Sequence, residues 1–377
     1  MKAIINTNII LPDHMIANGV VLIDGDRIVD FGKDVKVGSA DCLDAHGMFT
    51  GPGLIDIHLH ASGNTSFTED PEFAARFALE HGVTSLMPTL YFSETAPTLI
   101  NQAEKIRNVF DAGKAPNIIG LYMEAPYMNP NFGADRTNNP WVGDICRNDY
   151  IELVEKVGKW VRVWGVAPER ENIDMFVKDV LKVNPDAVFS VAHSEADPYQ
   201  IATLMKYGLK LATHHTNATG TLNKYPECRG VCVDEAVWYN DDIYAELICD
   251  KMGIHVDPYM LRLVKKIKGD NRIILISDSA TSNGSVPSGY DGADDIGFDE
   301  MGEISGSKMV LSGACRNMMY HTGSSLCQVL KYASTNPAKM LSLSDRGEIA
   351  IGKRADLIVT DALFDVKHVF LNGNQIK

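Results

Sequence analysis

The stretch Gly53-Leu-Ile-Asp-Ile-His-Leu-His60 decides the fold of this chain. A short apolar run that follows glycine and proline is typical of a buried β-strand. Because side chains two residues apart on a strand point the same way, His58 and His60 lie side by side at the strand end. Two neighbouring imidazoles suit one transition-metal ion. A single His-x-His pair is more often structural, so its interpretation depends on the residues that follow.

Downstream, apolar β-type runs alternate with amphipathic segments of helix length. Eight β/α units over about 250 residues are what a TIM barrel requires, and a doubly wound open sheet is the alternative. The barrel is favoured because polar residues close many different strands, and all strand ends of a barrel meet at one site. The predicted strands are Leu54–His58, Thr84–Thr89, Ile118–Glu124, Val161–Ala167, Ala187–His193, Leu209–His214, one within Ala245–His255, and Arg272–Asp278. The predicted helices include Glu72–His81, Thr95–Ala112, Tyr150–Lys159, Asn172–Val183, Pro198–Tyr207 and Pro258–Lys268.

Both ends of the chain have a different texture, with brief β-rich runs joined by turns. Because chain termini often lie close together, these runs predict one small β-sandwich domain built from residues 1–50 and 347–377. Residues 51–346 would then form the barrel. The predicted fold class is therefore α/β: a (β/α)8 TIM barrel with a small split β-sandwich.

Composition narrows the class of partner. The formal net charge of -14 argues against nucleic acid or an anionic membrane, so we expect a small-molecule substrate. The seven scattered cysteines are expected to be reduced thiols. The sequence shows neither a signal-peptide pattern nor an apolar run of membrane-spanning length, so we expect a cytoplasmic protein.

Histidine or carboxylate closes six of the eight predicted strands, which is hard to produce by chance. Imidazole and carboxylate without thiolate suit Zn²⁺ first, and also Fe²⁺, Mn²⁺ or Co²⁺. A catalytic ion of this kind lowers the pKa of bound water to about 7, and a nearby carboxylate then moves the proton. Asp278 is the predicted acid/base, and His255 is a candidate for oxyanion stabilisation or for a plain structural role. The residues are His58, His60, Glu124, His193, His214, His255 and Asp278.

The motifs around these residues resemble those of the amidohydrolase superfamily. Pro52–His60 resembles its signature, and Gly347–Asp361 resembles the segment that returns to the β-domain. Within the superfamily the chain resembles the N-acetylglucosamine-6-phosphate deacetylases. The matching segments are Gly120–Asn129, Thr213–Ala218, Ser277–Gly284 and Ile304–Met309.

This resemblance implies deacetylation of N-acetylglucosamine-6-phosphate by one or two divalent metal ions, in a possible homodimer. It implies that Glu124, His193 and His214 hold the first ion. A second ion would lie at His58 and His60, with Glu124 between the ions and Asp278 close to both. The implied substrate contacts are Asn217, Ala218, His255 and Ile304.

Two departures from the family concern the substrate. Glu227 stands where the family places a phosphate-binding arginine, with Arg229 displaced by two positions, and Asn138 stands where a substrate-binding histidine is expected. Arg136 or Arg229 could compensate. The alternatives are the same chemistry on another N-acyl amino sugar, an N-acyl amino acid or a cyclic amide. A non-catalytic scaffold is the least expected, because such proteins usually lose metal ligands.

Overall fold

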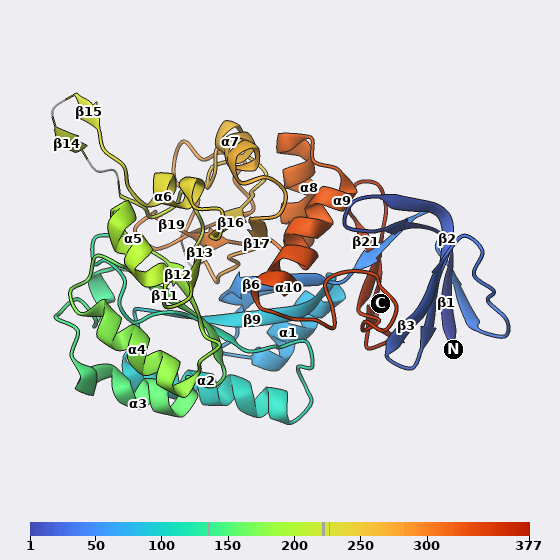
Figure 1. The fold of residues 1–377 in the computed structure, drawn as a ribbon, viewed down its shortest axis with the longest axis horizontal. Coiled ribbons are helices and arrows are strands. Elements are labelled where there is room, and N and C mark those ends of the chain that lie inside the picture. Colours follow the sequence, from blue (N-terminus) through green and yellow to red (C-terminus); the bar gives the residue numbers. More distant parts are fainter. Residues whose placement is uncertain (135, 221–222, 226, 283) are drawn as a thin grey trace.

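A parallel eight-stranded sheet forms the centre of the computed structural model, which describes residues 1–134, 136–220, 223–225, 227–282 and 284–377 (Figure 1). The strands follow the order β17-β16-β13-β12-β11-β10-β9-β6, so each one pairs with its sequence neighbour in the sheet. All eight strands predicted from the sequence are confirmed. Their bounds are β6 Leu54–Leu59, β9 Val83–Tyr91, β10 Leu121–Glu124, β11 Val161–Val166, β12 Val188–Val191, β13 Leu209–Ala212, β16 Tyr244–Ile248 and β17 Ile273–Ile276.

The two end strands, β6 and β17, lie against each other and nearly close the barrel. The backbone N–H of Asp278 donates to the carbonyl of His58 at 3.0 Å. The N–H of Ser277 also donates to the carboxylate of Asp56 at 3.3 Å. Burial raises the pKa of Asp56 to about 7, although Ser277 and His58 oppose that shift. Strand ends from opposite edges of the sheet are thereby brought to one rim.

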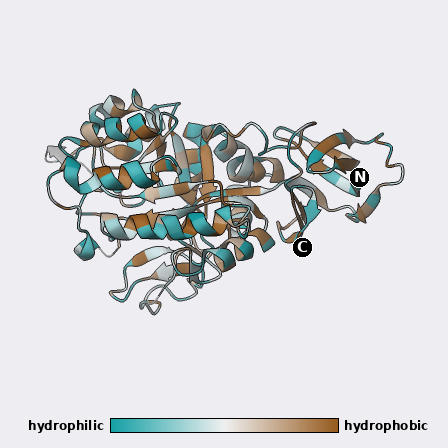
Figure 2. Ribbon diagram, turned by 90° about the horizontal axis from the view of Figure 1, so that it is seen from below, coloured by the Kyte–Doolittle hydropathy of each residue, from teal (hydrophilic) through white to brown (hydrophobic). Residues whose placement is uncertain are grey.

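Amphipathic helices cover the outside of the sheet, and in Figure 2 they carry alternating hydrophilic and hydrophobic bands. Three of them begin with an Asp-Pro pair, in which the aspartate caps the helix and proline starts its first turn. The Asp70 carboxylate, for example, accepts a hydrogen bond from the N–H of Phe73 at 3.0 Å. The helices are α1 Pro71–Glu80, α2 Ala96–Asp111, α3 Arg147–Val157, α4 Ile173–Val183, α5 Pro198–Met205, α6 Val233–Tyr239, α7 Pro258–Lys268, α8 Leu311–Thr322, α9 Leu326–Leu330 and α10 Asn336–Met340, with short turns η1 Arg136–Asn138 and η2 Lys331–Thr335.

A second sheet combines the two chain ends, which lie near each other in Figure 1. Its central joint is the antiparallel pair β5–β20, where Thr50 faces Val359. A separate buried core that includes Ile4, Val21 and Phe370 holds it together. The strands are β1 Lys2–Ile10, β2 Met15–Asp24, β3 Arg27–Gly32, β4 Asp41–Asp44, β5 Phe49–Pro52, β20 Leu357–Thr360, β21 Val366–Leu371 and β22 Asn374–Gln375.

The predicted fold class, a barrel with a small β-domain, is confirmed, while the residue boundaries between the domains stay a prediction. Three small hairpins complete the described part of the chain: β7 Ala61–Ser62 with β8 Thr65–Ser66, β14 Asn223–Tyr225 with β15 Cys228–Arg229, and β18 Ile296–Phe298 with β19 Ile304–Ser307. Among the helices that the structure describes, none is long and apolar enough to cross a membrane.

Candidate active site

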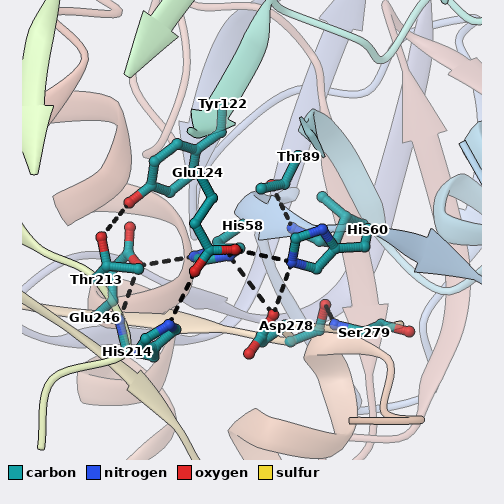
Figure 3. A network of polar contacts seen from close by, with 12 residues as sticks. His58, His60, Thr89, Tyr122, Glu124, Thr213, His214, Glu246, Asp278 and Ser279 are labelled. Atoms are coloured by element: carbon teal, nitrogen blue, oxygen red, sulfur yellow. Dashed lines mark hydrogen bonds and ion pairs between the residues drawn. The ribbon is translucent and has the colours of Figure 1, made fainter. Parts of the chain in front are cut away.

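Residues from the ends of five barrel strands meet at one rim of the sheet. Figure 3 shows His58, His60, Glu124, His214 and Asp278 pointing toward a common centre. Backbone conformation helps to aim them: φ is 42° at His193, 26° at His214 and 45° at Asp278. Positive φ is unfavourable for side chains with a Cβ, so the rim holds these residues against their local preference.

Glu124 lies at the centre of the cluster and is 1% exposed. Its Oε1 is 2.6 Å from Nε2 of His193 and 3.0 Å from Nε2 of His214. Its Oε2 is 3.5 Å from Nε2 of His58 and 3.3 Å from Nε2 of His60. One carboxylate therefore faces two pairs of imidazoles, one pair with each oxygen.

Asp278 completes the second half of the cluster. Its Oδ1 lies 3.6 Å from Nε2 of His58 and 3.4 Å from Nε2 of His60. The cluster divides into two groups whose ligand atoms lie within 4.8 Å of one another: His58, His60 and Asp278, and Glu124, His193 and His214.

Each group fits a divalent ion. Ligands about 2.1 Å from a tetrahedral ion lie about 3.4 Å apart, close to most of the separations above. Nε2 of His193 and Nε2 of His214 are 3.2 Å apart, and both face the same oxygen of Glu124. Nε2 of His58 is buried without a hydrogen-bond partner in the described part of the chain. One cation in each group would satisfy these atoms.

The electrostatics of the cluster keep its carboxylates ionised. Burial opposes ionisation of Glu124, but His193 and His58 hold its pKa well below the usual range. Burial also opposes ionisation of Asp278, yet His58 and His60 lower its pKa. Burial likewise disfavours the charged form of His60, but hydrogen bonds with Asp278 and Glu124 raise its pKa to about 9. The carboxylates therefore attract positive charge to the centre.

Glu246, on β16, is a member of the site that sequence reasoning missed. Its carboxylate accepts hydrogen bonds from Nδ1 of His58 at 3.1 Å and from the N–H of His214 at 3.2 Å. It is 0% exposed, so it acts from behind the cluster and turns Nε2 of His58 toward Glu124 and Asp278. The available signal was an acidic residue within the apolar run Tyr244–Ile248.

A cavity of about 550 Å³ opens above the cluster. His255 lines it, with its Nδ1 3.2 Å from the carboxylate of Asp250. Burial opposes ionisation of Asp250, but His255 and two backbone N–H groups lower its pKa to about 2. Nε2 of His255 is the ring atom left for a molecule in the cavity, since no described residue bonds to it.

The other residues predicted to contact substrate do not all lie at the cavity. Asn217, Ala218 and Ile304 line the cavity, whereas Asn138 is exposed in η1 and is not among the lining residues, so its role stays a prediction. The side chain of Arg229 lies outside the described residues. Glu227 is exposed in the turn between β14 and β15 and does not line the cavity.

Arg136 does line the cavity, but it is already paired. Its guanidinium donates to both carboxylate oxygens of Glu303, at 2.7 and 2.9 Å. Such bidentate pairs are strong and directional. Any anion that uses Arg136 must therefore compete with Glu303.

Comparisons with known proteins identify the family of the chain. Residues 50–376 match the model described as "Amidohydrolase family". A Bacillus subtilis N-acetylglucosamine-6-phosphate deacetylase is 26% identical over 348 residues, covering 86% of this chain and 83% of the relative. An Escherichia coli O157:H7 N-acetylgalactosamine-6-phosphate deacetylase is 27% identical over 340 residues, covering 85% of this chain and 86% of the relative.

The fold also agrees with solved structures. The crystal structure of N-acetylglucosamine-6-phosphate deacetylase from Pasteurella multocida matches with a TM-score of 0.85 and 24% identity, covering 99% of each chain. At that identity the likeness shows the fold alone. The family model spans most of the sequence and confirms the resemblance seen in its motifs. The chain therefore belongs to the amidohydrolase family.

Proposed function

We propose that this amidohydrolase removes the acetyl group of an N-acetylated amino sugar 6-phosphate, with N-acetylglucosamine-6-phosphate as the first candidate. One observation carries the hydrolytic part: Glu124 faces four imidazoles, and Asp278 faces the same centre from the cavity floor. The relatives named above are deacetylases of amino sugar phosphates, which supports the substrate class.

Amidohydrolases are metal-dependent, and the clustered ligands suit one or two divalent transition-metal ions. Glu124, His193 and His214 would hold one ion. His58, His60 and Asp278 would hold the second, with Glu124 between the two. We infer Zn²⁺ first, with Fe²⁺, Mn²⁺ or Co²⁺ as alternatives. When bound, such an ion supplies a water of lowered pKa and polarises the amide carbonyl.

The chain itself moves the protons and orients the amide. Asp278 takes the proton of the attacking water at its carboxylate and delivers it to the departing nitrogen. His255 meets the developing negative charge on the carbonyl oxygen with Nε2, while Asp250 holds its ring through Nδ1. Asn217, Ala218 and Ile304 form the wall against which the sugar ring would lie.

The cavity offers little unpaired positive charge to a phosphate group. Arg136 is the one Lys or Arg side chain among the described residues that line the cavity, and Glu303 neutralises it. A phosphorylated substrate would therefore have to displace Glu303 from Arg136 or use Arg229, whereas the alternative of an uncharged N-acyl substrate needs neither. The cytoplasmic location expected from the sequence and the homodimer implied by the resemblance stay predictions.

Acetate release from the metal-loaded enzyme tests the proposal. The rate with N-acetylglucosamine-6-phosphate is compared with the rates for the unphosphorylated sugar and for N-acetylgalactosamine-6-phosphate. We expect the phosphorylated substrates to have a kcat/KM at least tenfold higher than that of the unphosphorylated sugar. Equal or faster turnover of the unphosphorylated sugar would reject the phosphosugar assignment and leave the hydrolytic chemistry intact.

A further inference from the structure

The opposite end of the barrel carries a second and larger cavity, of about 780 Å³, which we name the basal cavity. It lies at the start of three barrel strands: Arg162 belongs to β11, Val188 begins β12, and Lys210 belongs to β13. His193 and His214 follow the far ends of β12 and β13. At about 3.3 Å per residue, His193 lies about 16 Å further along the chain than Val188, so the basal cavity is separate from the active site.

Positive charge is concentrated in the basal cavity. Lys159, Arg162, Lys206 and Lys210 line it, against the single carboxylate of Asp186. This is unusual in a chain whose formal net charge is -14. No ion pair within 4.0 Å is found for these four cations among the described residues, whereas Lys114 and Lys156 elsewhere on the surface each pair with a carboxylate.

Two of the cations, Arg162 and Lys210, are half-buried without an ion pair among the described residues, although Arg162 donates to the carbonyl of Leu341 at 3.5 Å. Burial is the one cause that lowers the pKa of Lys210. Burial, followed by the charge of Arg346, lowers the pKa of Arg162, although Asp186 and Asp345 oppose that shift. Removing cations from water without a carboxylate in direct contact disfavours the folded state. An anion bound between them would remove that cost.

The walls offer more than charge. Nζ of Lys206 lies 5.0 Å from the ring centroid of Tyr207, and both residues line the basal cavity. Nζ of Lys178 lies 5.7 Å from the same centroid, so the partly exposed ring of Tyr207 borders the cavity with two ammonium groups beside it. A guanidinium with neighbouring ammonium groups suits phosphate oxygens, and an aromatic ring suits a planar or cyclic group attached to the phosphate.

We propose that the basal cavity is a binding site for a phosphorylated small molecule, separate from the site of hydrolysis. The phosphate would lie between Arg162 and Lys210, with its cyclic group against Tyr207. This site goes beyond the proposed function and does not depend on it.

Calorimetric titration of the metal-loaded protein tests the proposal with adenosine 5′-monophosphate, ribose 5-phosphate and adenosine. We expect saturable binding of both phosphates and none of adenosine at the same concentration. If only the nucleotide binds among the phosphates, the ligand is a nucleotide; if both bind alike, the phosphate group is the recognised part. Arg162→Gln and Lys210→Gln should each weaken binding at least tenfold. Lys33→Gln removes one positive charge at an exposed position directly after β3, far from the basal cavity in sequence. It is the control for the loss of charge and should leave binding unchanged.

Hydrolytic activity serves as the check that the variants fold, because neither residue belongs to the active site. The proposal is overturned if neither phosphate binds saturably, or if binding persists in both variants. It is also overturned if a substrate analogue that fills the active site competes with the bound phosphate, since the heat would then report on the other cavity.

Discussion

Replacing Glu246 with leucine should weaken metal binding, although Glu246 belongs to neither group of metal ligands. The change removes the acceptor for two buried donors, Nδ1 of His58 at 3.1 Å and the N–H of His214 at 3.2 Å. Each donor left without a partner costs about 1–3 kcal/mol, so the two lost hydrogen bonds should lower the free energy of unfolding by about 2–6 kcal/mol. Part of this loss is offset because the leucine variant no longer bears the unfavourable desolvation of a buried carboxylate. We expect a net loss of about 2–3 kcal/mol on these figures.

The metal affinity should fall further than stability alone explains. Partners that orient a ligating histidine typically contribute 10- to 100-fold in affinity, which corresponds to about 1.4–2.7 kcal/mol. Glu246→Gln retains an acceptor oxygen for His58 and should lose less. The assay is a competition titration against a chelator, read as metal affinity and as ions bound per chain, with hydrolysis at saturating metal measured in parallel.

Asp179→Leu provides the matched control. Asp179 lies on α4 and is 4% exposed, and its carboxylate accepts from Arg147 at 2.8 Å and Tyr150 at 2.9 Å. Its loss should destabilise the fold to a similar degree and leave metal affinity unchanged. If Glu246→Leu binds metal as tightly as the parent while its unfolding free energy falls, the positioning role of Glu246 is refuted.

Four further outcomes are expected. Asp278→Asn should keep an ion at Glu124 and its two histidines but lower kcat by about 10²–10⁴-fold, as checked by metal content and acetate release; an active variant would contradict the acid/base role. Removing metal with a chelator should abolish hydrolysis, and Zn²⁺ or Fe²⁺ should restore it; a metal-free protein that gains nothing from either ion would count against the enzyme mechanism. Glu303→Gln should free Arg136 and lower KM several-fold for a phosphorylated substrate, with KM for its unphosphorylated form unchanged; an equal effect on both would show that Arg136 does not meet the phosphate. Because Asp250 has a pKa of about 2 when folded and an ordinary value of 3.8, its ionised form contributes about 2 kcal/mol above pH 4, and this is lost as the pH falls toward 2. Urea unfolding at pH 5 and pH 3 measures that loss, which should be smaller in Asp250→Asn.

The barrel strands could be predicted because each is a buried apolar run. The two groups of metal ligands could be predicted because their members close those runs. β6, for example, is buried throughout, and His60 directly follows its end. Glu246 escaped prediction because it interrupts an apolar run instead of closing one. The pair between Arg136 and Glu303 escaped because its members are 167 positions apart and lie in segments without a periodic pattern. Patterns of neighbouring residues do not predict a contact between such distant positions.

The positive φ angles at His193, His214 and Asp278 reduce the stability of the fold but place side chains that the proposed reaction needs. A left-handed backbone costs a residue with a Cβ about 1–2 kcal/mol, a cost that glycine does not bear. Directed evolution for heat resistance alone should therefore replace these three residues early with glycine or asparagine. The resulting protein would be more thermostable but would lack hydrolytic activity. Thermostabilisation of this protein needs an activity requirement in every round of selection.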